Sequence, residues 1–94
     1  MRKHDFEIYL SSEGLTSQAV STRLEHAQNA ESILGKSLDV VVSDDDNMYE
    51  DLHKLKPLDD PQHSHLQNAV RKYYKFCNGK EFPQLKDYHS YKHP

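Results

Sequence analysis

The chain has 94 residues, 35% hydrophobic and 29% charged, and its formal net charge is −3 at pH 7. A chain of this length forms one domain with one modest core, which excludes a deep substrate cleft between two domains. The only cysteine, Cys77, excludes an internal disulfide and a CxxC metal site.

Two helices are predicted in the first 35 residues. A short helix is indicated by apolar residues at positions i, i+3 and i+4, which are Phe6, Tyr9 and Leu10. Gly14 is suited to end it, because glycine adopts the left-handed conformation at little cost. Thr16 then predicts the N-cap of a longer helix that runs to about Leu34 and is closed by Gly35. Its apolar stripe consists of Val20, Leu24, Ala27, Ala30 and Leu34.

A third helix is predicted between residues 44 and 55. The β-branched run 38–42 has no second strand to pair with, so we expect an extended or one-turn linker there. Ser43 and Asp46 have the spacing of a capping box, and Pro57 stops the helix. Its core face comprises Met48, Leu52 and Leu55.

A fourth helix is predicted from Asp60 and Pro61, a capping residue followed by proline at the first helical position. It runs to about Cys77, and Asn78 and Gly79 end it. Its apolar face is wide and comprises Leu66, Ala69, Val70, Tyr73, Phe76 and Cys77. The sequence therefore predicts an all-α domain of four helices over residues 1–80, in which Leu24, Leu52 and Val70 are buried because each lies in the middle of its stripe.

The remaining segment, residues 81–94, is a polar C-terminal tail with spaced aromatic residues. Either it packs back on the helices or it is disordered. The two parts of the chain differ in charge: residues 1–60 hold six Lys/Arg against thirteen Asp/Glu (−7), and residues 61–94 hold six against two (+4). This asymmetry either orients a charged partner or is an ordinary solvated surface.

Several segments of the sequence, taken in chain order, resemble those of a known family. They are Phe6-x-x-Tyr9-Leu10-x-x-x-Gly14-Leu15-Thr16-x-x-Ala19-Val20, the run 38–46, the helix 48–55 and Asn68-Ala69-Val70-Arg71-Lys72-Tyr73-Tyr74-Lys75-Phe76. Together, over roughly residues 4–78, they resemble the core-binding (SAM-like) domain of tyrosine recombinases and phage integrases. The resemblance implies a small helical domain that touches DNA, and it points to mobile elements. The family's catalytic domain follows this module and is absent here, and the second helix carries one base, Arg23, beside the acidic Glu25.

The first candidate site is the exposed face of the fourth helix. Within about 100° of arc it presents Asn68, Arg71, Lys72 and Lys75. The bases would neutralise phosphates of double-stranded DNA, and the asparagine could read a base edge. An ordinary solvated helix face accounts for the same residues.

The second candidate site is acidic and lies on the third helix. It comprises Asp44, Asp45, Asp46, Glu50 and Asp51. The three consecutive aspartates are explained by helix capping and by the helix dipole. Alternatively, the five residues bind a basic protein surface, and the chain is then an adaptor or inhibitor from a mobile element.

Metal binding and catalysis are not favoured by the sequence. The pairs His63/His65 and His89/His93 have no cysteine-rich or acidic partners, so they are interpreted as surface histidines, with no metal and no cofactor expected. Cys77 falls on an apolar face and is interpreted as a buried structural thiol. No tyrosine has the paired arginines that a recombinase nucleophile requires. We therefore expect a binding module and not an enzyme.

The first residues carry charges with no apolar run behind them, and no apolar stretch reaches the roughly 20 residues that span a bilayer. We expect a cytoplasmic protein without a membrane contact.

Overall fold

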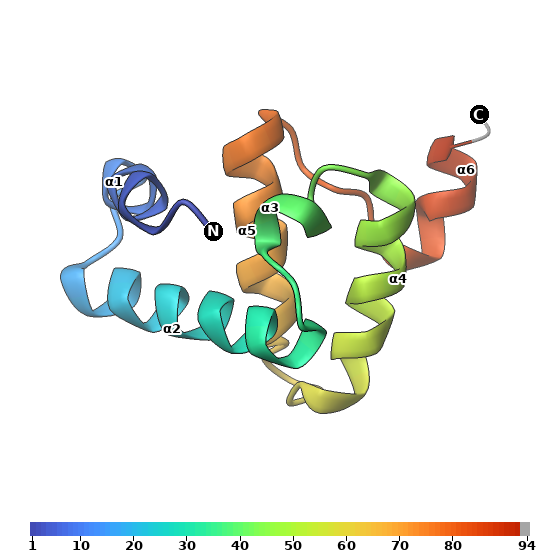
Figure 1. Ribbon diagram of the computed structural model, residues 1–94, viewed down its shortest axis with the longest axis horizontal. Coiled ribbons are helices and arrows are strands. Elements are labelled where there is room, and N and C mark those ends of the chain that lie inside the picture. Colours follow the sequence, from blue (N-terminus) through green and yellow to red (C-terminus); the bar gives the residue numbers. More distant parts are fainter. Residues whose placement is uncertain (93–94) are drawn as a thin grey trace.

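The computed structural model describes residues 1–92, and every regular element in that range is helical (Figure 1). The elements are α1 (Lys3–Ser12), α2 (Ser17–Leu34), α3 (Leu38–Val41), α4 (Asp45–Leu55), the 3₁₀ turn η1 (Lys56–Leu58), α5 (His65–Asn78), the 3₁₀ turn η2 (Leu85–Asp87) and α6 (Tyr88–Lys92). The all-α prediction is confirmed. The predicted count of four is too low, because the linker forms one helical turn and the tail adds α6.

The caps of α2 are confirmed. The Thr16 side chain accepts a hydrogen bond of 3.1 Å from the backbone N–H of Ala19. Gly35 ends the helix with φ of 69°, a left-handed conformation that favours glycine.

The predicted cap of α4 is wrong by one residue. Asp44, and not Ser43, accepts a hydrogen bond of 3.0 Å from the N–H of Asn47. The Ser43 hydroxyl instead donates to the carbonyl of Val40, at 2.7 Å, and this carbonyl also accepts the backbone N–H of Ser43. The N-cap of α4 is therefore Asp44, one residue later than predicted.

The predicted start of α5 is also wrong, because residues 60–64 form a separate turn. The N–H of Ser64 donates to the carbonyl of Asp60, at 2.9 Å, and Ser64 has φ of 50°, which breaks helical continuity. The carboxylate of Asp59 then accepts the N–H groups of Leu66 at 2.7 Å and Gln67 at 3.0 Å. A side chain outside the helix thus satisfies donors of its first turn.

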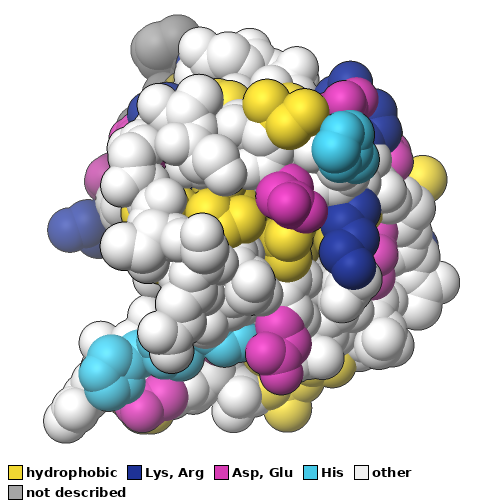
Figure 2. Space-filling view, turned by 90° about the vertical axis from the view of Figure 1, so that its left-hand side faces the viewer, with side chains coloured by type: hydrophobic (Ala, Val, Ile, Leu, Met, Phe, Trp, Pro, Cys, Tyr) yellow, Lys and Arg dark blue, Asp and Glu magenta, His cyan; other side chains and the backbone are white. Residues whose placement is uncertain are grey.

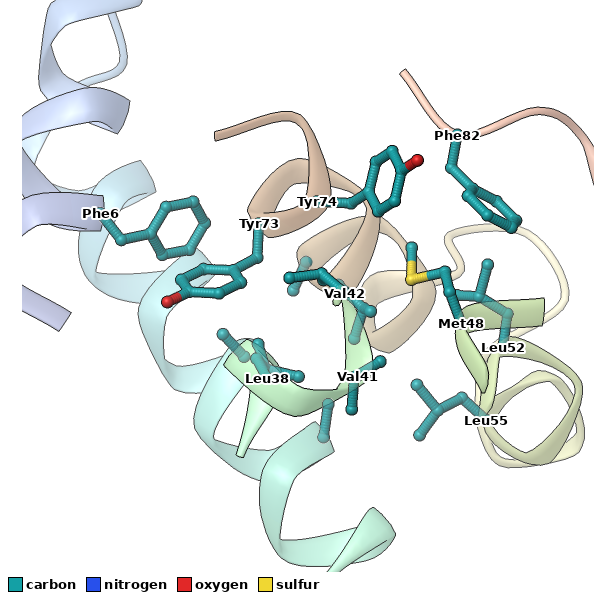
Figure 3. Packing of buried hydrophobic residues seen from close by; sticks show 14 of the residues in the cluster. Phe6, Leu38, Val41, Val42, Met48, Leu52, Leu55, Tyr73, Tyr74 and Phe82 are labelled. Atoms are coloured by element: carbon teal, nitrogen blue, oxygen red, sulfur yellow. The ribbon is translucent and has the colours of Figure 1, made fainter. Parts of the chain in front are cut away.

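One core joins all the longer helices. In Figure 1, α2 and α4 lie on either side of α5, and α1 crosses above the start of α2. Figure 3 shows Phe6 and Tyr73 on the α1 side of the core and Met48 and Leu52 on the α4 side. The predicted core positions are confirmed, with exposed fractions of 6%, 0% and 0% for Leu24, Leu52 and Val70.

Residues 81–92 of the tail pack back on the helices. Phe82 and Tyr88 are buried in the same cluster as the rest of the core, and the Phe82 ring meets that of Tyr74 edge-on at 5.1 Å. Figure 1 shows α6 beside α4. The last two residues of the tail, His93 and Pro94, lie outside the described residues.

Candidate functional site

The exposed face of α5 follows from the burial of its other side. Ala69, Val70, Tyr73 and Tyr74 are at most 1% exposed, so the helix cannot rotate about its axis. Asn68, Arg71, Lys72 and Lys75 stand on the remaining arc, where they are exposed or half-buried. The four residues predicted for the first site therefore share one face.

Arg71 is bound to the tail as well as to this face. Its Nη1 donates to the carbonyls of Phe82 at 3.0 Å and Pro83 at 3.1 Å, and its guanidinium lies over the Phe82 ring. Burial lowers the pKa of the guanidinium. A guanidinium has five N–H donors, and Nε and Nη2 of Arg71 make no hydrogen bond within residues 1–92. Arg71 thus binds the tail through Nη1, and the N–H groups on Nε and Nη2 remain able to donate to a ligand.

The two lysines form ion pairs at the surface. Lys72 Nζ lies 2.8 Å from Glu13, the residue that follows α1, and this hydrogen bond lowers the pKa of the glutamate. Lys75 Nζ lies 3.5 Å from Glu81, whose side chain is 80% exposed. Partly exposed pairs of this kind contribute little to stability, so another anion can replace either carboxylate.

A basic hollow of about 270 Å³ opens over these residues. Its wall includes all four predicted side chains and adds Arg23 from α2 and Gln84 from the tail. Arg23 forms no ion pair within residues 1–92. Sequence reasoning recognised Arg23 only as a lone base on α2 and missed that the packing of α2 against α5 brings it to the other three cations.

A large hollow of about 760 Å³ adjoins the basic hollow. It lies between η1, the start of α5 and the tail, and it shares Asn68, Arg71 and Gln84 with the basic hollow. Two further cations line it, Lys56 and Lys86, and neither forms an ion pair within residues 1–92. The cationic surface therefore continues past the start of α5.

The two carboxylates in the large hollow are occupied by the chain itself. Asp59 caps α5 and also accepts the side-chain N–H of Gln67, at 3.1 Å. Asp60 accepts the N–H of Gln62 at 2.9 Å and lies 2.9 Å from Nδ1 of His63. Both acids remain negative charges of the large hollow, and its three cations, Lys56, Arg71 and Lys86, outnumber them.

A histidine hollow of about 380 Å³ lies on the other side of Arg23, which it shares with the basic hollow. The rings of His26 and His65 line it and are stacked with centroids 4.7 Å apart, and His63 stacks on His65 at 5.2 Å. Figure 2 shows histidine side chains in a row along the lower edge of this face of the molecule. Burial, followed by the charge on His65, lowers the pKa of His26.

The three hollows form one surface because each shares residues with the next. Six Lys or Arg side chains line them, and three Asp or Glu side chains. The formal charge of this lining is +3 in a chain whose net charge is −3. Positive charge is thus concentrated on one hollowed face of an acidic molecule.

The five acidic residues of the second predicted site do not form one open surface. Asp44 caps α4, and Asp51 is 1% exposed and lies 2.8 Å from Lys36. Asp45 accepts the hydroxyl of Tyr74 at 2.8 Å. Asp46 accepts the Tyr88 hydroxyl at 2.6 Å and the Lys92 ammonium at 2.6 Å. Glu50 is exposed.

The chain's own tail therefore occupies much of the acidic surface. Tyr88 and Lys92 are tail residues, and the Tyr91 hydroxyl lies 3.4 Å from Asp45. Asp45 and Asp46 thus meet aromatic hydroxyls and one ammonium that the molecule itself supplies.

Within residues 1–92, no group of three His, Cys, Asp or Glu side chains is arranged to hold a metal ion. The predicted pair His89/His93 includes a residue outside that range. Cys77 is half-buried and its Sγ accepts a hydrogen bond of 3.3 Å from Arg2, so it is less buried than predicted. None of the helices in residues 1–92 combines the length and apolar character needed to cross a bilayer.

Comparisons with protein-family models, with curated proteins and with solved structures each find no match for this chain.

Proposed function

We propose that this domain is a non-catalytic module that binds duplex DNA through the face formed by α2, α5 and the three hollows. The observation that carries the proposal is the continuity of the cationic lining from Arg23, across Lys72 and Lys75, to Lys56 and Lys86. A protein that neutralises phosphates releases condensed counterions, and this release supplies sequence-independent affinity.

The side chains between these cations suit a phosphate backbone. Thr16, Gln18 and Thr22 line the histidine hollow beside Arg23, and Asn68 and Gln84 line the basic hollow. Hydroxyl and amide side chains of this kind supply many of the hydrogen bonds to phosphates that position a protein on DNA. The acidic clusters of the chain do not oppose this contact directly, because Asp45 and Asp46 face the tail on α4.

The family resemblance is part of the same proposal. The resemblance to a core-binding domain fits a DNA-associated accessory role, and the family's second and fourth helices correspond here to α2 and α5. An adaptor role through the acidic residues of α4 is less well supported, because most of these residues are engaged within the chain.

A labelled duplex at about 50 mM salt tests the proposal, since phosphate contacts are strongest at low salt. The variant R23A/K72A/K75A removes three cations of the basic hollow and leaves Arg71 to hold the tail. A matched control, K3A/K54A/K80A, removes the same charge outside the hollows. We expect the wild type and the control to bind and the first variant to bind weakly. Equally weakened binding in both variants would show that only net charge matters.

A further inference from the structure

The large hollow has the size and chemistry of a site for a single nucleotide. Its volume of about 760 Å³ lies within the range of about 300–1,000 Å³ for small-molecule sites. Its wall combines apolar side chains, Pro57, Pro61 and Leu85, with the amides of Gln67 and Gln84. Extruded bases are held by such a combination, with apolar contacts to the ring faces and hydrogen bonds to the base edge.

The polar groups in the wall are arranged to receive hydrogen bonds. Gln67 is only 9% exposed, and its Nε2 is fixed by the carboxylate of Asp59, which sets the direction of its side-chain oxygen. Asn68 is held in the same way, because its Nδ2 donates to the carbonyl of His63, at 3.0 Å. Gln84 makes no side-chain hydrogen bond within residues 1–92. Two oriented acceptors and one unengaged amide therefore line the hollow.

The position of the large hollow connects it to the DNA face. It shares Asn68, Arg71 and Gln84 with the basic hollow, so a strand whose phosphates follow Lys72 and Lys75 passes its mouth. Lys56 and Lys86 line it from η1 and η2 and can neutralise the phosphates on either side of a nucleotide that enters. A paired base cannot enter, because it stays inside the stack and shows only its groove edges.

We propose that the large hollow receives one unpaired nucleotide of a DNA strand, such as a bulged or terminal base. The inference rests on the proposed function. A free nucleotide offers the same chemistry as a nucleotide in a strand, namely a base with an adjacent phosphate. The experiment must therefore distinguish a nucleotide within a DNA strand from a free one.

The experiment compares a blunt duplex with the same duplex carrying one central unpaired 2-aminopurine, at equal salt. We expect about tenfold tighter binding to the bulged duplex, the effect of one well-placed set of base contacts. The environment of 2-aminopurine changes when it leaves the stack, so its fluorescence should change on binding. Gln84→Ala leaves the charge unaltered and should remove both the preference and the fluorescence change, so that the bulged duplex binds no more tightly than the blunt one. Lys54→Ala, outside the hollows, is the control and should behave as the wild type.

Equal affinity for both duplexes, with no change in fluorescence, would overturn this inference and leave the proposed function intact. Binding of neither duplex would overturn the proposed function itself. A deoxynucleoside monophosphate added at about 1 mM separates the sources. If it binds with the same dependence on Gln84 while the two duplexes remain equal, the hollow takes free nucleotides and the strand-borne source is wrong.

Discussion

The hydroxyl of Tyr88 donates a hydrogen bond of 2.6 Å to the carboxylate of Asp46, and the two residues are 42 positions apart in the sequence. Burial, and then this hydrogen bond, raise the pKa of Tyr88, so the hydroxyl stays protonated and remains a donor. The contact fixes α6 against α4. It also explains why the acidic run is not an open docking surface.

Replacing Tyr88 with phenylalanine should loosen the tail without removing the ring from the core. We expect a decrease in stability of about 1.5 kcal/mol, the lower end of the range for a hydrogen bond to a charged group, because Lys92 still neutralises Asp46. Amide hydrogen exchange should accelerate in residues 85–92. Tyr91→Phe is the control, because its hydroxyl lies 3.4 Å from Asp45 and the residue is 40% exposed. If both variants behave alike, the tail is not held by Tyr88.

The packing of α4 predicts unequal effects for two leucines. Leu52 is fully buried, so Leu52→Ala should cost roughly 2–5 kcal/mol in urea melts. Leu58 is 58% exposed, so Leu58→Ala should stay within about 0.5 kcal/mol of the wild type. An effect at position 52 as small as that at position 58 would mean that the core is assigned to the wrong face.

The capping role of Asp59 can be tested directly. Asp59→Ala removes the acceptor for the first-turn N–H groups of α5, and the expected decrease in stability is about 1–2 kcal/mol. Asp60→Ala should cost less, because Asp60 closes only an exposed turn through Gln62 and His63. The reverse order would favour a helix that starts at Pro61, as the sequence predicts.

The difference between these two starts shows where sequence reasoning ends. The dipeptide Asp60-Pro61 is a strong local signal for a helix start, and Thr16 and Gly35 are signals of the same kind that hold for α2. At α5 the local sequence signal does not set the helix start. The helix begins later because Ser64 has a positive φ and the Asp59 side chain, from outside the helix, accepts N–H groups of its first turn. Periodicity located the centre of each buried face, since burial acts on every turn of a helix. On α5 it missed Gln67 and Tyr74, which are buried, and Leu66, Phe76 and Cys77 of the predicted face are only partly buried.

The site was predictable only in part for the same reason. Lys72 and Lys75 lie on one helix, and their spacing alone places them on one face. Arg23 and Lys86 come from other elements, and no local pattern shows that packing unites them with the lysines. The pairing of acidic α4 with the tail is equally non-local.

The lowered pKa of His26 predicts that stability depends on pH. A group whose folded-state pKa is depressed resists protonation in the fold, so stability is full above about pH 6.5, the usual value for histidine, and declines as the pH falls. The charges around the ring act in both directions: His65 and Arg23 lower the pKa, and Glu25 and Asp59 raise it.

Urea melts between about pH 7.5 and 5.5 test this effect, because the carboxylates titrate below that range. The wild type should become less stable across the window, and His26→Gln should show a smaller decrease. His4→Gln, on the exposed side of α1, is the control. Parallel curves for all three proteins would contradict the assignment.

The salt dependence of duplex binding tests the central claim most directly. For the wild type, the logarithm of the association constant should fall linearly with the logarithm of salt concentration, because each neutralised phosphate releases counterions. In R23A/K72A/K75A the slope should be shallower by about 0.9 for each phosphate that the variant no longer neutralises, whereas K3A/K54A/K80A should keep the wild-type slope. A slope unchanged by the first variant, or no binding of any duplex at about 50 mM salt, would contradict the proposed DNA face.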